Sequence, residues 1–229
     1  MKHLKFFLDF DGTISTKDVV DAVLSRFAPP EWEAIEREWV LGNIGSRECL
    51  SKQLALVRAG MPELEAVLKH VKLDPGFESF LKTATEREVP VTIASDGFDV
   101  FIRKILDQSL AQKSLMDNVP VFCNRLEIRA GRLNTFFDSA PCAHGCANCK
   151  EAVLKRLTGE KDFTIFVGDG LSDRFAAKAS DLVFAKGALL DFCRAHKLKH
   201  RAYADFGEIE SWLKDVQKNQ TVIQSMRIL

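Results

Sequence analysis

The sequence predicts an α/β fold: a doubly wound (Rossmann-like) parallel sheet with an inserted helical cap domain. Four short apolar runs have the character of buried strands, and helical patterns separate them along the chain. Continuous apolar strands joined by helices are typical of a parallel sheet covered on both faces. After the first strand, a stretch of roughly 60 residues contains no strand pattern. A helical block at that point is expected to lie over the strand ends as a lid.

The core elements follow from local patterns. Each expected strand is rich in β-branched or aromatic residues and is followed by Asp, Ser or Gly. These strands cover residues 5–8, 89–94, 163–167 and 182–185. The expected core helices cover residues 75–87, 98–110, 150–157, 172–179, 189–197 and 208–217. Alternating character around Ala130-Gly131 predicts a small β-hairpin within residues 119–137.

Residues 16–72 are expected to form the cap, and residues 1–15 and 73–229 the core. Ser46 is a plausible N-cap for one cap helix. An amphipathic stripe predicts that helix, and it consists of Cys49, Leu50, Gln53, Leu54 and Val57. Two further helix starts are indicated by a proline in the first turn beside an acid, at residues 29–31 and 61–63.

Composition excludes several classes of function. The 32 Lys and Arg residues balance 32 Asp and Glu residues, which argues against a generally basic nucleic-acid surface. No apolar run approaches the length of a membrane span. The first apolar run is interrupted by Asp9 and is too short for the core of a signal peptide. We therefore expect a cytoplasmic protein, a monomer or homodimer, that binds neither nucleic acid nor membrane.

Polar residues follow three of the expected strands. Ligands of an open α/β sheet bind at the carboxyl ends of its strands, so these residues are expected to meet there. Each of them alone also fits a turn, a helix cap or a solvated helix start. Together, in this order, they predict one site. The set is Asp9, Asp11, Ser95, Lys150, Asp169 and Asp173.

These motifs, in their order and spacing, resemble the four motifs of the haloacid-dehalogenase-like phosphatase superfamily, and the resemblance spans nearly the whole chain. A helical cap between the first and second motifs is similar to the phosphoserine-phosphatase branch. Residues 27–32, the cysteine-rich run before Lys150 and residues 177–182 further resemble phosphatases of methionine salvage.

The resemblance implies a phosphomonoesterase that acts on a small phosphorylated metabolite, with a methionine-salvage ester as the first candidate. Phosphoserine, phosphoethanolamine and phosphocholine are the alternative substrates. A phosphotransferase that uses the same intermediate, and a catalytically silent binding protein built on this fold, are the alternative functions.

The resemblance also implies a role for each residue of the set. Asp9 would attack phosphorus, and Asp11 would act as general acid and then as general base. Ser95 and Lys150 would hold the phosphate. Mg²⁺ would be bound by the Asp9 carboxylate, the Asp11 main-chain carbonyl and Asp169. Asp173 would belong to the acidic metal site and would orient water or Lys150.

Substrate selection is expected around the second motif, at Asp96 and Gly97, and on the cap, at Arg47 and Glu48. The two cap residues also fit a solvated helix face. Asp96 is a departure, because salvage and phosphoserine phosphatases tend to have Gly there, whereas phosphoethanolamine/phosphocholine phosphatases have Asp. An acid at this position could recognise an amine, or it could form an Asx turn that points away from the site.

The cysteines form a second pattern. Cys142, Cys146 and Cys149 have a spacing typical of a metal site, for which zinc is the candidate ion and Cys123 a possible fourth ligand. Three reduced thiols or a disulfide are the alternatives, and a cytoplasmic setting argues against the disulfide. Cys49, Cys193 and, as its other interpretation, Cys123 lie in apolar contexts typical of core residues.

Overall fold

The structure, a computed structural model, describes residues 3–218 and confirms the predicted α/β class. Its sheet has the strand order β4-β3-β2-β1-β5-β6-β7. The strands are β1 (His3–Leu8), β2 (Val91–Phe98), β3 (Val121–Arg129), β4 (Arg132–Phe136), β5 (Asp162–Gly168), β6 (Leu182–Ala185) and β7 (His200–Ala202). Strand β1 lies at the centre, in parallel pairing with β2 and β5. Only the pairing of β3 with the edge strand β4 is antiparallel within this sheet.

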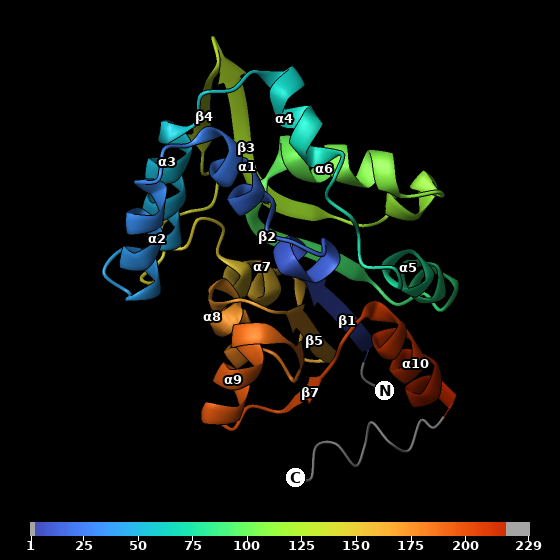
Figure 1. Cartoon of the computed structure of the whole chain (residues 1–229). Coiled ribbons are helices and arrows are strands. Elements are labelled where there is room, and N and C mark those ends of the chain that lie inside the picture. The colour runs from blue at the N-terminus through green and yellow to red at the C-terminus, as the bar shows by residue number, and fades with distance from the viewer. Residues whose placement is uncertain (1–2, 219–229) are drawn as a thin grey trace.

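Helices cover both faces of the sheet (Figure 1). Phe6 and Leu8 of β1 point to one face, where they join the core formed with α5 (Phe77–Glu86), α6 (Asp99–Ser109) and α10 (Phe206–Lys218). Phe7 points to the other face, where α7 (Lys150–Leu157), α8 (Arg174–Ala179) and α9 (Gly187–Ala195) pack. The alternation of side chains along a strand thus gives the two apolar layers of a doubly wound fold.

Four helices separate β1 from α5, which confirms the helical insertion. They are α1 (Val19–Phe27), α2 (Trp32–Val40), α3 (Ser46–Leu56) and α4 (Met61–Leu68). Helices α2 and α3 pack on each other at the side of the molecule, next to β4 (Figure 1). Leu24 of α1 and Leu64 of α4 belong to the main core. The expected domain boundaries stay a prediction, and residues 1–2 and 219–229 of the expected core lie outside the described residues.

Three local details differ from the sequence expectation. Strand β7 was not predicted, because its three residues His-Arg-Ala carry no apolar pattern. Strand β2 continues past Ala94 to Phe98, since its pairing with β3 resumes after a register shift between these two residues. Gly45, not Ser46, is the N-cap of α3.

The expected hairpin is confirmed as β3 and β4. It turns at Ala130 and Gly131, both with positive φ (48° and 70°), as a tight hairpin turn requires. Three short helical turns complete the description: Phe10–Ile14, Lys113–Met116 and Leu171–Asp173. Within residues 3–218, none of the helices has the length and apolar character needed to span a membrane.

Candidate active site

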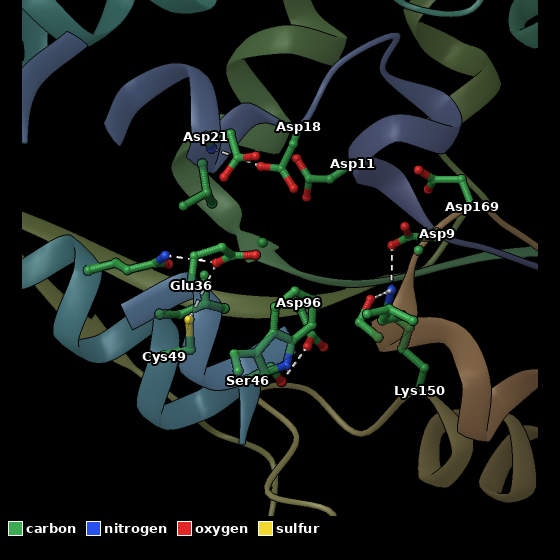
Figure 2. A pocket seen from close by; sticks show the side chains of 18 residues that line it. Asp9, Asp11, Asp18, Asp21, Glu36, Ser46, Cys49, Asp96, Lys150 and Asp169 are labelled. Carbon is green, nitrogen blue, oxygen red and sulfur yellow. Dashed lines mark hydrogen bonds and ion pairs between the residues drawn. The ribbon is translucent and has the colours of Figure 1, made fainter. Parts of the chain in front are cut away.

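The strand-end motifs converge at one cavity beside the carboxyl end of β1 (Figure 2). Asp9 follows β1 directly, and its main-chain N–H donates to the carbonyl of Val167 at 2.9 Å. The turn after Asp9 brings Gly12 close to the carboxylate of Asp169, the acid that follows β5. At Gly12 (φ 71°) a Cβ atom would collide with the Asp169 carboxylate, so only glycine allows this approach.

Lys150 is the buried cation of the site. Its Nζ lies 2.6 Å from Asp9 Oδ1 and 2.6 Å from Asp173 Oδ1, and it donates to Ser172 Oγ at 3.2 Å. The lysine side chain is 2% exposed. Burial alone would lower the pKa of Lys150, but Asp173 and Asp9 raise it well above its usual value, so the ammonium group keeps its charge.

Three carboxylates form a cluster that can hold a metal ion. One oxygen from each of Asp9, Asp169 and Asp173 lies within 4.8 Å of the other two. Burial, and then Asp173, raise the pKa of Asp9 well above its usual value and that of Asp169 to about 6. A divalent cation with a preference for oxygen ligands would relieve this repulsion, and the donor set fits Mg²⁺.

The two later acids are held differently. Asp173 Oδ1 contacts Lys150, while its Oδ2 accepts the N–H groups of Asp169 (3.0 Å) and Gly170 (3.1 Å). Both oxygens of Asp173 are therefore engaged by the protein. Asp169 Oδ1 accepts only the hydroxyl of Thr13, at 2.9 Å, among the described contacts. Asp169 is thus the better placed of the two for direct contact with a metal, and Asp173 for orienting Lys150.

Asp11 is placed to hold a proton. Its Oδ1 accepts the Val19 N–H at 3.0 Å, and its Oδ2 accepts the Ser95 hydroxyl at 3.2 Å. Burial, and then the neighbouring Asp18, raise its pKa to about 8. A carboxyl group with this pKa carries a proton at neutral pH, as a general acid must.

Gly97 packs between Ser95 and Asp11, and its main-chain N–H is not free to bind a substrate. Its N–H donates to Ser95 Oγ at 2.9 Å, and a Cβ atom here would lie 2.7 Å from Asp11 Oδ2. The residue type is therefore set by the close packing of Ser95 and Asp11.

The inserted helices supply a wall of the cavity, as expected, but through residues that the sequence analysis does not single out. Its acidic residues are Asp18, Asp21 and Glu36, and its apolar residues include Val20, Trp39 and Leu50. In Figure 2, Asp9, Asp169 and Lys150 lie at one end of the cavity, and Asp21 and Glu36 at the opposite end. Among these wall residues, only Asp18 has a recognisable local role, as the N-cap of α1 that accepts the Asp21 N–H at 2.9 Å.

Asp96 lines the cavity and also accepts hydrogen bonds from two neighbouring segments of the chain. Its Oδ2 accepts the Ser46 hydroxyl of α3 at 2.7 Å, and its Oδ1 accepts the Asn148 N–H at 3.2 Å. Ser46, expected as an N-cap, therefore connects the cap to the end of β2. Asn148, which was not predicted, further donates to the main-chain carbonyl of Ser95 at 3.0 Å.

The structure corrects the expected placement of Arg47 and Glu48, since neither lines this cavity. Arg47 donates to the carbonyls of Ser139 (2.6 Å) and Cys146 (3.3 Å). Glu48 pairs with Lys52 at the surface, at 2.6 Å. The helical period explains this, because the cavity face of α3 is formed by positions spaced three and four apart. Those positions are Ser46, Cys49, Leu50 and Gln53.

Residues 6–178 match the haloacid dehalogenase-like hydrolase family. The chain belongs to that family and is an enzyme of its phosphatase class. It is similar to the 2-hydroxy-3-keto-5-methylthiopentenyl-1-phosphate phosphatase of Brevibacillus brevis, with 32% identity over 95% of this chain and 98% of the relative. The corresponding phosphatase of Geobacillus thermodenitrificans is 29% identical over 94% of this chain and 98% of its own.

Longer proteins and solved structures complete the comparison. The bifunctional enzyme MtnB/MtnX of Bacillus licheniformis is 32% identical over 94% of this chain, which spans 52% of that enzyme. A substrate-bound phosphoserine phosphatase complex has a TM-score of 0.67 at 22% identity and covers 93% of this chain and 98% of its own. A phospho-aspartyl intermediate analogue of phosphoserine phosphatase has a TM-score of 0.65 at 23% identity, over 92% and 98%. These structures show that the chain shares its fold with phosphoserine phosphatases.

Proposed function

We propose that this chain hydrolyses a small phosphate monoester through a phosphorylated Asp9, with Mg²⁺ as cofactor. The observation that carries the proposal is the buried pair of Asp9 and Lys150, 2.6 Å apart, with Asp11 beside it. This arrangement unites a nucleophile, a fixed positive charge and a proton donor, the three groups that phosphoryl transfer needs.

The reaction takes two steps. In the first, an Asp9 carboxylate oxygen forms a bond to phosphorus while the bond from phosphorus to the ester oxygen breaks, and Asp11 donates its proton to the leaving alkoxide. In the second, Asp11 takes a proton from a water molecule that attacks phosphorus, so the aspartyl-phosphate bond breaks and phosphate leaves. Lys150 holds Asp9 in place and balances negative charge at the phosphate end of the cavity.

Mg²⁺ would be held by Asp9 and Asp169, with the Asp11 main-chain carbonyl as a further oxygen ligand. When bound, it would supply positive charge beside the transferred phosphoryl group. Asp173 would act indirectly, through its contacts with Lys150 and with the main-chain N–H of Asp169.

The first candidate substrate is 2-hydroxy-3-keto-5-methylthiopentenyl-1-phosphate. The names of relatives that match this chain over nearly their full length support it. The cavity supports it too, since Val20, Trp39 and Leu50 offer apolar surface to a methylthio chain.

A specific observation favours a second candidate, a phosphorylated amino alcohol such as phosphoethanolamine or phosphocholine. Asp21 and Glu36 lie at the end of the cavity away from Asp9. Lys150, the one cationic side chain among the described residues of the lining, is already paired with Asp9 and Asp173. Carboxylates without a cation attract an ammonium group and repel the carboxylate of phosphoserine.

The mechanism is tested by Asp9→Asn. The amide oxygen is a far weaker nucleophile than the carboxylate, so we expect turnover to fall by about 1,000-fold or more at saturating Mg²⁺. Steady-state phosphate release and mass spectrometry of acid-quenched enzyme measure this, with a labile mass increase of one phosphoryl group only in the wild type. Wild-type turnover by the Asp9→Asn protein would refute the mechanism.

Product analysis with a competing acceptor alcohol separates hydrolysis from phosphotransfer.

A further inference from the structure

Three thiol groups meet in the loop that precedes α7. The Sγ atoms of Cys142, Cys146 and Cys149 all lie within 4.8 Å of one another, and all three cysteines are free. Cys146 and Cys149 are 8% and 6% exposed. In tetrahedral zinc sites, with Zn–S bonds of about 2.3 Å, sulfur ligands lie about 3.8 Å apart. The three thiols therefore need only small shifts to reach this geometry.

The loop backbone is folded around Cys142. The Cys146 N–H points at Cys142 Sγ at 3.5 Å, and the Gly145 N–H donates to the Cys142 carbonyl at 3.0 Å. Gly145 has φ of 64°, a conformation that side-chain-bearing residues rarely adopt. This turn brings the first two cysteines of the motif together, and an amide that points at sulfur stabilises a thiolate.

No protein side chain among the described residues completes the group. His144 stacks on Phe175, with ring centroids 3.6 Å apart. Cys123, expected as a possible fourth ligand, packs instead against the main hydrophobic core. Cys142 is half-buried, so the fourth coordination position would be open to water.

The loop connects the cap to the catalytic lysine. Arg47 of α3 donates its main-chain N–H to the Gly145 carbonyl at 3.1 Å, and its side chain donates to the Cys146 carbonyl at 3.3 Å. A Cβ atom at Gly45 would collide with the Gly145 backbone. Lys150 follows Cys149, the N-cap of α7, without an intervening residue.

We propose that Cys142, Cys146 and Cys149 bind one zinc ion, with water as the fourth ligand, and that this ion fixes the loop between α3 and Lys150. Three S–H bonds are replaced by three Zn–S bonds, and three protons leave to solvent. The site is separate from the Mg²⁺ site and does not depend on the proposed reaction.

The test is the zinc content of the full chain, purified without an affinity tag that binds metal and without chelators. We expect about one zinc per chain in the wild type by elemental mass spectrometry, and none in Cys146→Ser. Cys123→Ser is the matched control, because its thiol lies outside the cluster, and it should keep the zinc.

A second measurement covers the case in which Cys146→Ser does not fold. Titration of the native wild type with an organomercurial should release one zinc per chain to a chromogenic chelator as the cluster thiols react. A wild type that contains no zinc and takes up none from Zn²⁺ solution would overturn the proposal. Non-reducing alkylation that leaves two of the three thiols unmodified through a disulfide would also overturn it.

Discussion

Two carboxylates share the Lys150 ammonium group, and this sharing defines the chemistry at the scale of single residues. Asp9 contacts it from β1, and Asp173 from the turn after β5. Removing either partner would leave a buried charge without its full balance, which is costly. The site therefore depends on pairs of residues rather than on isolated side chains.

Gly97 is a residue whose small size the site requires. In Gly97→Ala the new methyl group would press on Asp11 and Ser95, so the acid/base carboxyl would shift. We expect kcat to fall by about 100-fold, since a displacement near 1 Å has this effect on a catalytic group. The control is Gly159→Ala, where the nearest atom is 3.9 Å away. Equal kcat for the two variants would contradict this account of Gly97.

Asp21 and Glu36 test what the cavity recognises. For phosphoethanolamine and phosphocholine, we expect the double change Asp21→Asn and Glu36→Gln to lower kcat/KM by about tenfold or more, as the loss of charged contacts does. The methylthiopentenyl ester carries no cation, so its kcat/KM should stay within about twofold. Glu48→Gln is the matched control, a cap acid outside the cavity. A loss of the same size for both kinds of ester would show that the two acids do not select an amine.

At the scale of elements, α10 contacts α5 through apolar rings, with Phe206 packed on Phe77 and Phe80, and also through one buried carboxylate. Glu210 accepts the hydroxyls of Thr83 (2.5 Å) and Ser79 (3.0 Å) and pairs with Lys214 at 2.6 Å. Burial alone would raise the pKa of Glu210, but Lys214 and the two hydroxyls lower it below its usual value. A lowered pKa means that the charged form stabilises the fold.

Glu210→Gln should therefore destabilise the protein in a pH-dependent way. We expect the free energy of unfolding to fall by about 1–2 kcal/mol at pH 7. The stabilisation by the charged form is present above the unfolded pKa of Glu and is lost as the pH falls through the lower folded pKa, so the difference should shrink below about pH 4. Urea unfolding at pH 7 and below about pH 4 measures this difference in the free energy of unfolding. Asp215→Asn, at an exposed position of the same helix, is the control. A difference that does not change with pH would contradict the assigned role of the charge.

The elements that could be predicted from the sequence are those with a strong local pattern. Strands β1 and β5 are continuous apolar runs, and the acids at their ends marked the site. Strand β7 has no such run, and its pairing with β6 becomes visible only in the fold. The cavity wall at Asp21 and Glu36 is formed by residues of two different helices, α1 and α2, so no spacing along the chain indicates it. Ser46 fits a helix start in the sequence, but its hydrogen bond to Asp96 spans 50 positions, so no local pattern indicates that bond.

At the scale of the whole molecule, the site belongs to no single segment. Its residues come from the ends of β1 and β2, from α7 and from the turn after β5. The inserted helices, which lie between β1 and β2 in the sequence, line the rest of the cavity. The two apolar layers fix the sheet from both sides and so fix where the strand ends meet. Because the positions of all these groups depend on one sheet, a change that loosens the sheet should reduce activity and stability together.

The central position of β1 also has a consequence for how the protein is made. This strand is synthesised before either of its neighbours in the sheet, because Phe6 pairs with Val91 on one side and with Ile165 on the other. Residues 9–161 must be synthesised after β1 before its second neighbour, β5, exists, and such distant pairings form slowly. Until then the apolar residues of β1 lack one of their partners in the sheet, and exposed apolar strands of this kind are prone to aggregate.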